Sequence, residues 1–319
     1  MQLAPIVLFT YNRPDHTRRT LNSLKANLLA DQSELYIFCD GPKEGTSQAD
    51  IERIKAVRRL VREENWVGKI YIKESKTNRG LARSIIDGVT EVIEKYGRVI
   101  VLEDDLELSS GFLKYMNDAL EFYNDEERVM HISGFMISLE PELPETIFLN
   151  LTSCWGWGTW SRAWKQLNED ASGLYETLKK KNLLDKFNFE GCSDLALQLY
   201  SNIDGNLNTW AVKWYASVFL QEGYCLHPGI TLVRNIGFDE LSSNTNSGTE
   251  LLESKELSNN VPVNKIEFEE SVTAREAYKT LFLDTRGSSR VKLFLYKNYS
   301  SSILIRLFFR YYIKINKLF

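Results

Sequence analysis

The chain has 319 residues, of which 43% are hydrophobic and 26% charged, and its formal net charge is −4. This composition is typical of a globular protein that buries a core without disulfides, and the acidic balance does not favour a nucleic-acid partner, which would usually present a basic surface. Because no C-x-x-C pair, signal-peptide pattern or run of roughly 20 apolar residues is present, we expect a cytoplasmic protein with free thiols and no spanning helix.

The N-terminal part of the chain alternates between strand and helix signals. Four short apolar runs indicate buried strands at Pro5–Phe9, Leu35–Phe38, Ile70–Ile72 and Val99–Leu102. Apolar residues at helical spacing follow the first three runs, after Asp15, over Ile51–Arg62 and over Leu81–Tyr96. This alternation predicts an α/β fold with a largely parallel sheet that is covered by helices on both faces.

Polar clusters follow three of the predicted strands. They are Thr10–Pro14, Asp40 and Glu103–Asp105. In open α/β sheets, ligands bind beyond the carboxyl ends of the strands. We therefore expect one crevice to collect all three clusters.

The acidic run Glu103–Asp105 carries the clearest chemical signal. Three carboxylates in a row repel one another unless a cation lies among them. Mg²⁺ and Mn²⁺ prefer carboxylate and phosphate oxygens, so a metal held here could bridge to a diphosphate and stabilise the charge of a departing nucleotide. The alternative interpretation is a solvated acidic turn before the predicted helix Gly111–Phe122.

Several motifs resemble the GT-A glycosyltransferase superfamily, in its family-two-like branch. Thr10–Pro14 is similar to the loop after the first strand, Asp40–Gly41 to the acidic residue that contacts the base, and Asn78–Arg83 to the helix entry beside the donor. Glu103–Glu107 has the sequence E-D-D-L-E, which is especially similar to the N-acetylglucosaminyltransferase I group. The resemblance covers roughly residues 4–240, with the motifs in the family's order.

The resemblance implies a GT-A fold, a Rossmann-like mixed sheet with helices on both faces, over residues 1–285. Residues 1–105 would form the nucleotide-binding half and residues 106–285 the acceptor half. The chain would move a sugar, a hexosyl or N-acetylhexosaminyl group, from a nucleotide-diphosphate sugar to an acceptor hydroxyl in polysaccharide or lipid-linked glycan synthesis. The donor would be UDP-linked and the transfer inverting.

The same resemblance assigns roles to the acidic residues. Asp105, with Glu103 beside it, would bind Mn²⁺ or Mg²⁺. Asp104 would assist or contact the ribose, and Asp40 would accept a hydrogen bond from the base.

The donor would also contact the loop after the first strand, at Thr10, Asn12 and Arg13, together with Arg79. A guanidinium can pair with phosphate oxygens. The alternative for both arginines is a surface ion pair.

The run Cys154–Trp160 combines large aromatic side chains with glycines, and similar runs occur in bacterial polysaccharide glycosyltransferases of this type. Aromatic faces pack against sugar rings, so we expect Trp155 and Trp157 to lie nearest the donor. Trp160 and Trp164 are interpreted as structural. The alternative places these tryptophans in the core.

The general base of an inverting transfer is not assigned by the motifs. In the related group an Asp directly precedes a Trp, whereas this chain has Asn208–Trp210 without an acid. Asp204 and Asp239 are therefore the candidate bases, each with the alternative of an ordinary loop carboxylate.

The C-terminal residues 286–319 contain no acidic residue. Over Ile303–Phe319 the basic residues recur at helical spacing in an otherwise apolar segment. Such an amphipathic helix suits an anionic membrane surface, so we expect a peripheral protein on the inner face of the membrane. The alternative is a helix that packs on the protein and extends its cations to water.

Two other functions compete with the transferase. A sugar nucleotidyltransferase usually opens with a glycine-rich loop, and Thr10–Pro14 contains no glycine, which disfavours that class. A non-catalytic carbohydrate- or nucleotide-binding relative is compatible with the missing base.

Overall fold

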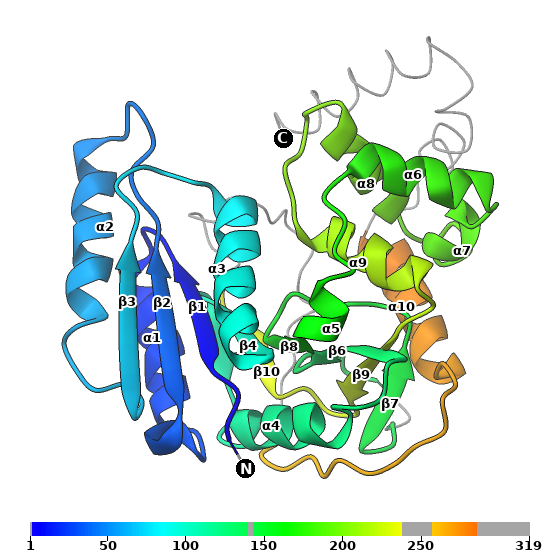
Figure 1. The fold of residues 1–319 in the computed structure, drawn as a ribbon, viewed down its shortest axis with the longest axis horizontal. Coiled ribbons are helices and arrows are strands. Elements are labelled where there is room, and N and C mark those ends of the chain that lie inside the picture. Colours follow the sequence, from blue (N-terminus) through cyan, green and yellow to red (C-terminus); the bar gives the residue numbers. More distant parts are fainter. Residues whose placement is uncertain (1, 140–142, 238–256, 286–319) are drawn as a thin grey trace.

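The computed structural model describes residues 2–139, 143–237 and 257–285 (Figure 1). Its N-terminal elements are β1 (Ile6–Thr10), α1 (Pro14–Lys25), η1 (Ala30–Gln32), β2 (Glu34–Cys39), α2 (Gln48–Leu60), β3 (Lys69–Glu74), α3 (Leu81–Tyr96), β4 (Arg98–Glu103), β5 (Leu106–Leu108) and α4 (Phe112–Phe122). They are followed by β6 (Val129–Ser133), β7 (Thr146–Leu149), β8 (Trp157–Trp160), α5 (Ser161–Trp164), α6 (Ala171–Lys180), α7 (Leu184–Phe187), α8 (Leu195–Ile203), α9 (Ala211–Leu220), β9 (Tyr224–Pro228), β10 (Val233–Asn235) and α10 (Val272–Thr285).

One mixed sheet organises the molecule. Its eight strands follow the order β3-β2-β1-β4-β8-β6-β9-β7, and β10 pairs separately with β5. The first four strands in this order are parallel, whereas β8 runs antiparallel to both of its neighbours, β4 and β6. All four strands predicted from the N-terminal apolar runs are therefore present, and they form the parallel half of the sheet.

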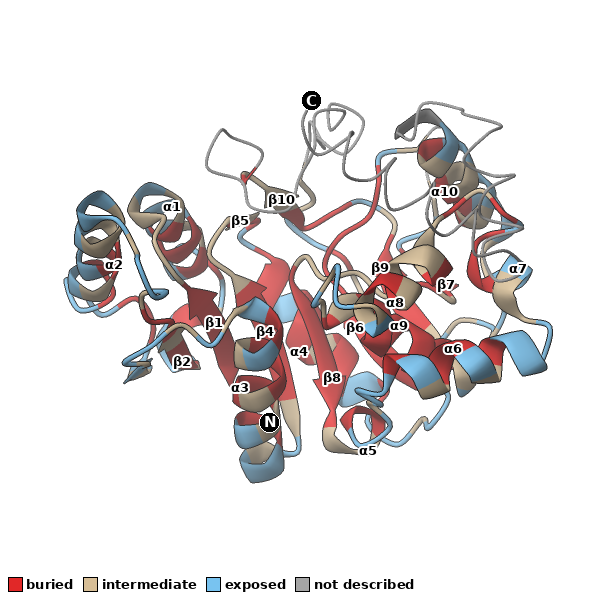
Figure 2. Ribbon diagram, turned by 90° about the horizontal axis from the view of Figure 1, so that it is seen from above, coloured by how far each residue is buried: buried red, intermediate tan, exposed pale blue. Residues whose placement is uncertain are grey.

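The alternation of side chains along β1 explains why helices cover both faces. Ile6 and Leu8 point into a core that includes Leu21 of α1, while Val7 and Phe9 point into a second core that includes Ile85 of α3. Successive residues of a strand face opposite sides, so an all-apolar strand needs a cover on each side. Figure 2 shows the central strands fully buried and the outer faces of α2 and α3 exposed.

Local sequence signals place the helix ends. The Ser47 hydroxyl accepts a hydrogen bond from the backbone N–H of Asp50 at 3.1 Å and donates to the Asp50 carboxylate at 2.8 Å, so Ser47 caps α2. Two leucines at the helix ends lie outside the core. Leu28 is exposed because α1 ends at Lys25, and Leu81 is exposed at the first turn of α3.

The helices α6 to α9 form a separate layer against the C-terminal half of the sheet (Figure 1). Their shared core includes Leu178 of α6, Leu199 of α8 and Tyr215 of α9, and it extends to Leu149 of β7 and Tyr278 of α10. The sequence analysis did not predict these helices.

The predicted basic tail, residues 286–319, lies outside the described residues, so its membrane role stays a prediction. Among the helices that the structure describes, none combines the length and the apolar character needed to cross a bilayer.

Candidate active site

Two of the predicted polar clusters meet at the carboxyl ends of β1 and β4. The two strands are parallel neighbours, with Phe9 paired with Glu103, so the residues after them leave the sheet at the same edge. The backbone N–H of Tyr11 donates to Asp104 Oδ2 at 3.2 Å, and the Thr17 hydroxyl lies 3.5 Å from the same oxygen. The loop after β1 and the first turn of α1 therefore orient Asp104.

Arg13 joins the acidic cluster to a third segment. Its guanidinium forms an ion pair with Asp105 Oδ2 at 3.1 Å and donates a hydrogen bond to the carbonyl of Gly237 at 2.8 Å. The Arg13 and Asp105 side chains are only 12% and 20% exposed, so this ion pair is shielded from water more than most surface pairs.

The turn Asn235–Gly237 packs directly on the acidic cluster. The backbone N–H of Ile236 donates to the Asp105 carbonyl at 2.8 Å, and β10 pairs with β5 just beyond the cluster. A Cβ atom added at Gly237 would lie 2.2 Å from Asp105 Oδ2, so a larger residue here would displace the Asp105 carboxylate. Asp239, one of the two candidate bases, follows this turn by two residues.

Two of the three carboxyl groups, those of Glu103 and Asp104, have strongly raised pKa values. Burial raises the pKa of Asp104 to about 7, and the neighbouring Asp105 charge adds to the shift. Burial, followed by the charges of Asp105 and Asp104, raises the pKa of Glu103 well above its ordinary value. Burial and the charges of Glu103 and Asp105 also raise the pKa of Cys154, which places this thiol beside the cluster. A positive ligand would relieve this repulsion.

The carboxylate oxygens of the cluster fit a hard divalent cation whose remaining ligands come from a bound molecule or from water. Carboxylate oxygens suit Mg²⁺ and Mn²⁺, which commonly take one or two carboxylates and draw their other ligands from phosphate and water. Within residues 2–139, 143–237 and 257–285, no group of three or more His, Cys, Asp or Glu side chains is arranged to hold a metal. Glu103 and Asp105 would hold such a cation together with oxygens from a bound phosphate or from water.

Asp40 lies directly after β2, as predicted, but its carboxylate is bound by other parts of the protein. Its Oδ1 accepts the backbone N–H groups of Gly41 at 2.8 Å and Arg79 at 2.9 Å. Its Oδ2 accepts the side-chain amide of Asn78 at 3.0 Å and the backbone N–H of Gly80 at 3.1 Å. A carboxylate has about four acceptor positions, which these four hydrogen bonds occupy. In this structure Asp40 fixes the entry to α3, and its hydrogen bond to a base stays a prediction.

Replacing Asp40 with asparagine is expected to lower the free energy of unfolding by about 1–3 kcal/mol, because the new amide presents N–H groups to donors that would lose their acceptor. Urea denaturation followed by circular dichroism measures this loss. Asp125→Asn is a matched control, since Asp125 is exposed and accepts from the neighbouring Asn124 side chain. Equal stability of the two variants would contradict the conclusion that the Asp40 hydrogen bonds hold the entry to α3.

The other residues predicted to contact the nucleotide sugar each have their own protein partners. Thr10 is buried, and its hydroxyl lies 3.5 Å from the Phe38 carbonyl. The Asn12 side chain donates to Asp50 of α2 at 3.0 Å. Arg79 forms an ion pair with Asp87, as the alternative interpretation of this arginine anticipated. Contacts of these residues with a donor stay predictions.

The two tryptophans predicted near the donor differ in position. Trp157 is completely buried, stacked on Trp210 at a ring-centroid distance of 5.0 Å and on His131 at 5.4 Å. Because these rings pack against it inside the core, the predicted contact of Trp157 with the sugar is wrong. Trp155 is partly exposed and packs edge-to-face on Phe135 at 4.4 Å, so its predicted role stands as a prediction.

The structure describes one of the two candidate bases. Asp204 lies at the end of α8, where its carboxylate accepts a hydrogen bond from the Asn206 backbone N–H at 3.1 Å. Asp239 lies outside the described residues. His227 is structural: both nitrogens of its buried ring face backbone carbonyls, of Phe135 and Leu151.

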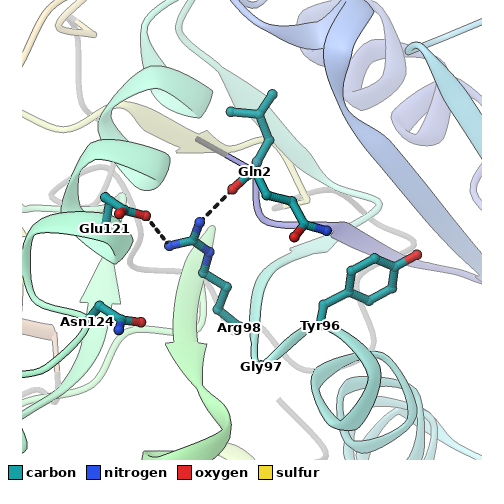
Figure 3. Close-up of a pocket in the computed structure, with 7 residues that line it drawn as sticks. Gln2, Tyr96, Gly97, Arg98, Glu121 and Asn124 are labelled. Atoms are coloured by element: carbon teal, nitrogen blue, oxygen red, sulfur yellow. Dashed lines mark hydrogen bonds and ion pairs between the residues drawn. The ribbon is translucent and has the colours of Figure 1, made fainter.

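A cavity of about 280 Å³ lies at the opposite edge of the sheet (Figure 3). Arg98, at the start of β4, forms an ion pair with Glu121 at 2.7 Å and donates to the Gln2 carbonyl. Because Gln2 and Arg98 precede or begin their strands, this cavity is at the amino ends of β1 and β4, away from the acidic cluster. It does not form part of the candidate site.

Comparison with known proteins supports the class that the fold and the site define. Residues 6–131 match the family described as Glycosyl transferase family 2. This stretch extends from β1 into β6 and contains Arg13 and the whole acidic cluster. No curated protein sequence matches the chain.

Solved structures show more distant likenesses. S. aureus TarS is 17% identical, with 46% of this chain and 24% of TarS covered and a TM-score of 0.32. Mouse xyloside xylosyltransferase 1, in its apo form, is 12% identical, with 69% and 81% covered and a TM-score of 0.35. UDP-glucose pyrophosphorylase complexed with UDP-glucose is 11% identical, with 52% and 79% covered and a TM-score of 0.29. The chain spans about a quarter of TarS, and we base no inference on likenesses at these TM-scores.

The chain has the predicted GT-A-like α/β fold, with a mixed eight-stranded sheet between helices. The family match over residues 6–131 supports a glycosyltransferase. The finer similarity to the N-acetylglucosaminyltransferase I group stays a prediction.

Proposed function

We propose that this protein transfers a sugar, a hexosyl or N-acetylhexosaminyl group, from a UDP-linked or other nucleotide-diphosphate donor to an acceptor hydroxyl, with the assistance of Mn²⁺ or Mg²⁺. The observation that carries the proposal is the junction at the carboxyl ends of β1 and β4. There Glu103–Asp105 and Arg13 lie together, within the stretch that matches a glycosyltransferase family. A carboxylate cluster with an adjacent guanidinium suits a metal-bound diphosphate.

The residues of the junction would divide the work of donor binding. Asp105 and Glu103 would hold the cation, which when bound supplies positive charge to the diphosphate as it leaves. Arg13 would pair with phosphate oxygens, and Asp104, oriented by the Tyr11 N–H, would contact the ribose. Trp155 would pack against the sugar.

In the proposed inverting transfer, the acceptor hydroxyl attacks the anomeric carbon opposite the diphosphate. A carboxylate takes the hydroxyl proton, and the bond between the sugar and the diphosphate oxygen breaks. Asp204 and Asp239 are the proposed bases. Removal of each carboxylate in turn should identify the one on which transfer depends.

The acceptor would be a growing polysaccharide or a lipid-linked glycan. The basic and apolar sequence of residues 286–319 supports a place on the inner face of the membrane, since such a segment is attracted to anionic lipid. A lipid-linked acceptor at that surface would lie within reach of the candidate site.

Thermal unfolding with a panel of nucleoside diphosphates, each with and without Mn²⁺, tests donor binding. A ligand present at about 100 times its dissociation constant stabilises the folded state by about 2.7 kcal/mol. We expect Mn²⁺-dependent stabilisation by one nucleoside diphosphate, which would identify the nucleobase of the sugar donor. Stabilisation by none of them would contradict the proposal. Stabilisation by a nucleoside triphosphate in place of a diphosphate would favour a nucleotidyltransferase.

A further inference from the structure

The Arg13 guanidinium contacts all three segments that meet at the acidic cluster. It begins in the loop after β1, pairs with Asp105 Oδ2 after β4 at 3.1 Å, and donates to the carbonyl of Gly237 after β10 at 2.8 Å. Its side chain is 12% exposed. The Arg13 guanidinium is largely buried and is paired with Asp105, the proposed metal ligand. When a cation binds Asp105, the guanidinium must either leave this carboxylate or share it with the cation.

The space around Asp105 Oδ2 is tightly bounded. Gly237 lies so close that an added Cβ would be 2.2 Å from this oxygen and 2.9 Å from the Arg13 guanidinium. The turn itself is held by the hydrogen bond from the Gly237 N–H to the Asn235 side chain at 2.7 Å and by the pairing of Asn235 with Leu106. The Arg13 guanidinium and the turn therefore both lie against the oxygen that a cation would need.

We propose that Arg13 is a built-in counter-cation that competes with the divalent cation for Asp105 and so sets the cation affinity of the site. This inference rests on the proposed function, since it assumes that Asp105 is a metal ligand. When a diphosphate enters with the cation, the guanidinium exchanges the carboxylate for phosphate oxygens, with which it forms similar charge-assisted hydrogen bonds. Arg13 thus opposes binding of the cation alone and favours binding of the cation together with the nucleotide.

The two effects have opposite signs, which makes the proposal testable. In Arg13→Gln, Mn²⁺ alone should bind about tenfold more tightly, a change that corresponds to about 1.4 kcal/mol. The nucleoside diphosphate, at saturating Mn²⁺, should bind about tenfold more weakly than to the unchanged protein. A variant that had merely lost structure at the site would bind both ligands more weakly.

The experiment measures free Mn²⁺ by electron paramagnetic resonance in the full chain, and nucleotide binding by calorimetry. Arg18→Gln is the matched control, because Arg18 lies on α1, the helix that directly follows Arg13, is exposed and pairs with Glu63. It removes the same charge and should change neither affinity by more than about twofold. Arg13→Lys keeps a positive charge and should lie between the unchanged protein and Arg13→Gln.

Equal Mn²⁺ affinity in the unchanged protein and in both Arg13 variants would overturn the competition, while Mn²⁺-dependent nucleotide binding would leave the proposed function intact. Nucleotide binding without any Mn²⁺ binding would overturn the inference and the metal assistance together. If Arg13→Gln does not fold, Arg13→Lys decides the question, since its single amine cannot bridge Asp105 and Gly237 as the guanidinium does.

Discussion

Replacing Trp157 with alanine is expected to lower the free energy of unfolding by about 3–5 kcal/mol, the cost typical of removing a large buried aromatic side chain. Trp157 is completely buried and stacks on Trp210 and His131, so its loss leaves a cavity between the sheet and the helices over it. Denaturation in guanidinium chloride, followed by circular dichroism, measures the change.

Trp155→Ala provides the matched comparison for Trp157. It removes the same side chain from a partly exposed position two residues away, so it should destabilise the protein much less. A loss of under about 1 kcal/mol in Trp157→Ala would mean that the packing around this indole is not as described.

The sequence predicted the parallel half of the sheet from its apolar runs, and its central strands β1 and β4 are buried on both faces. An apolar run such as Val99–Leu102, ended by polar residues, has few alternatives to a central strand. The order of these strands also brought Thr10–Pro14 and Glu103–Asp105 to one edge, as expected, because β1 and β4 are parallel neighbours. The fold class and the location of the candidate site were therefore within reach of the sequence.

The roles of individual side chains depended on tertiary packing and were less accessible. Asp40 follows a strand, as a base-contacting residue would, but the turn at Asn78–Gly80 folds back and donates three of the four hydrogen bonds to its carboxylate. Trp157 lies in a glycine-rich aromatic run, but it occupies β8, whose residues in the sheet interior are buried. Neither outcome is encoded in local spacing, because each depends on a segment that is distant in the chain.

Replacing Asp105 with asparagine is expected to lower the rate of sugar transfer by about 100-fold or more, a loss typical of removing one electrostatic contact to the developing charge. The change preserves shape and removes the charge that the proposed cation and Arg13 share. Release of nucleoside diphosphate from the donor, measured under saturating Mn²⁺, gives the rate.

Asp118→Asn controls for the loss of one acidic charge. Asp118 lies on α4, where it pairs with Lys114, and it has no contact with the acidic cluster. Its activity should equal that of the unchanged protein, and the two asparagine variants should unfold at similar denaturant concentrations. An Asp105→Asn variant with full activity would exclude this carboxylate from the transfer.

The central claim is that the junction of β1 and β4 binds a nucleotide sugar and releases its sugar. Its most direct test is the nucleoside diphosphate released from a panel of nucleotide sugars in the presence of Mn²⁺, with water or added glycans as acceptor. We expect release from one donor by the unchanged protein and almost none by Asp105→Asn. Release from no donor, by a folded protein that still binds nucleoside diphosphates, would contradict the transferase and leave a nucleotide-binding protein.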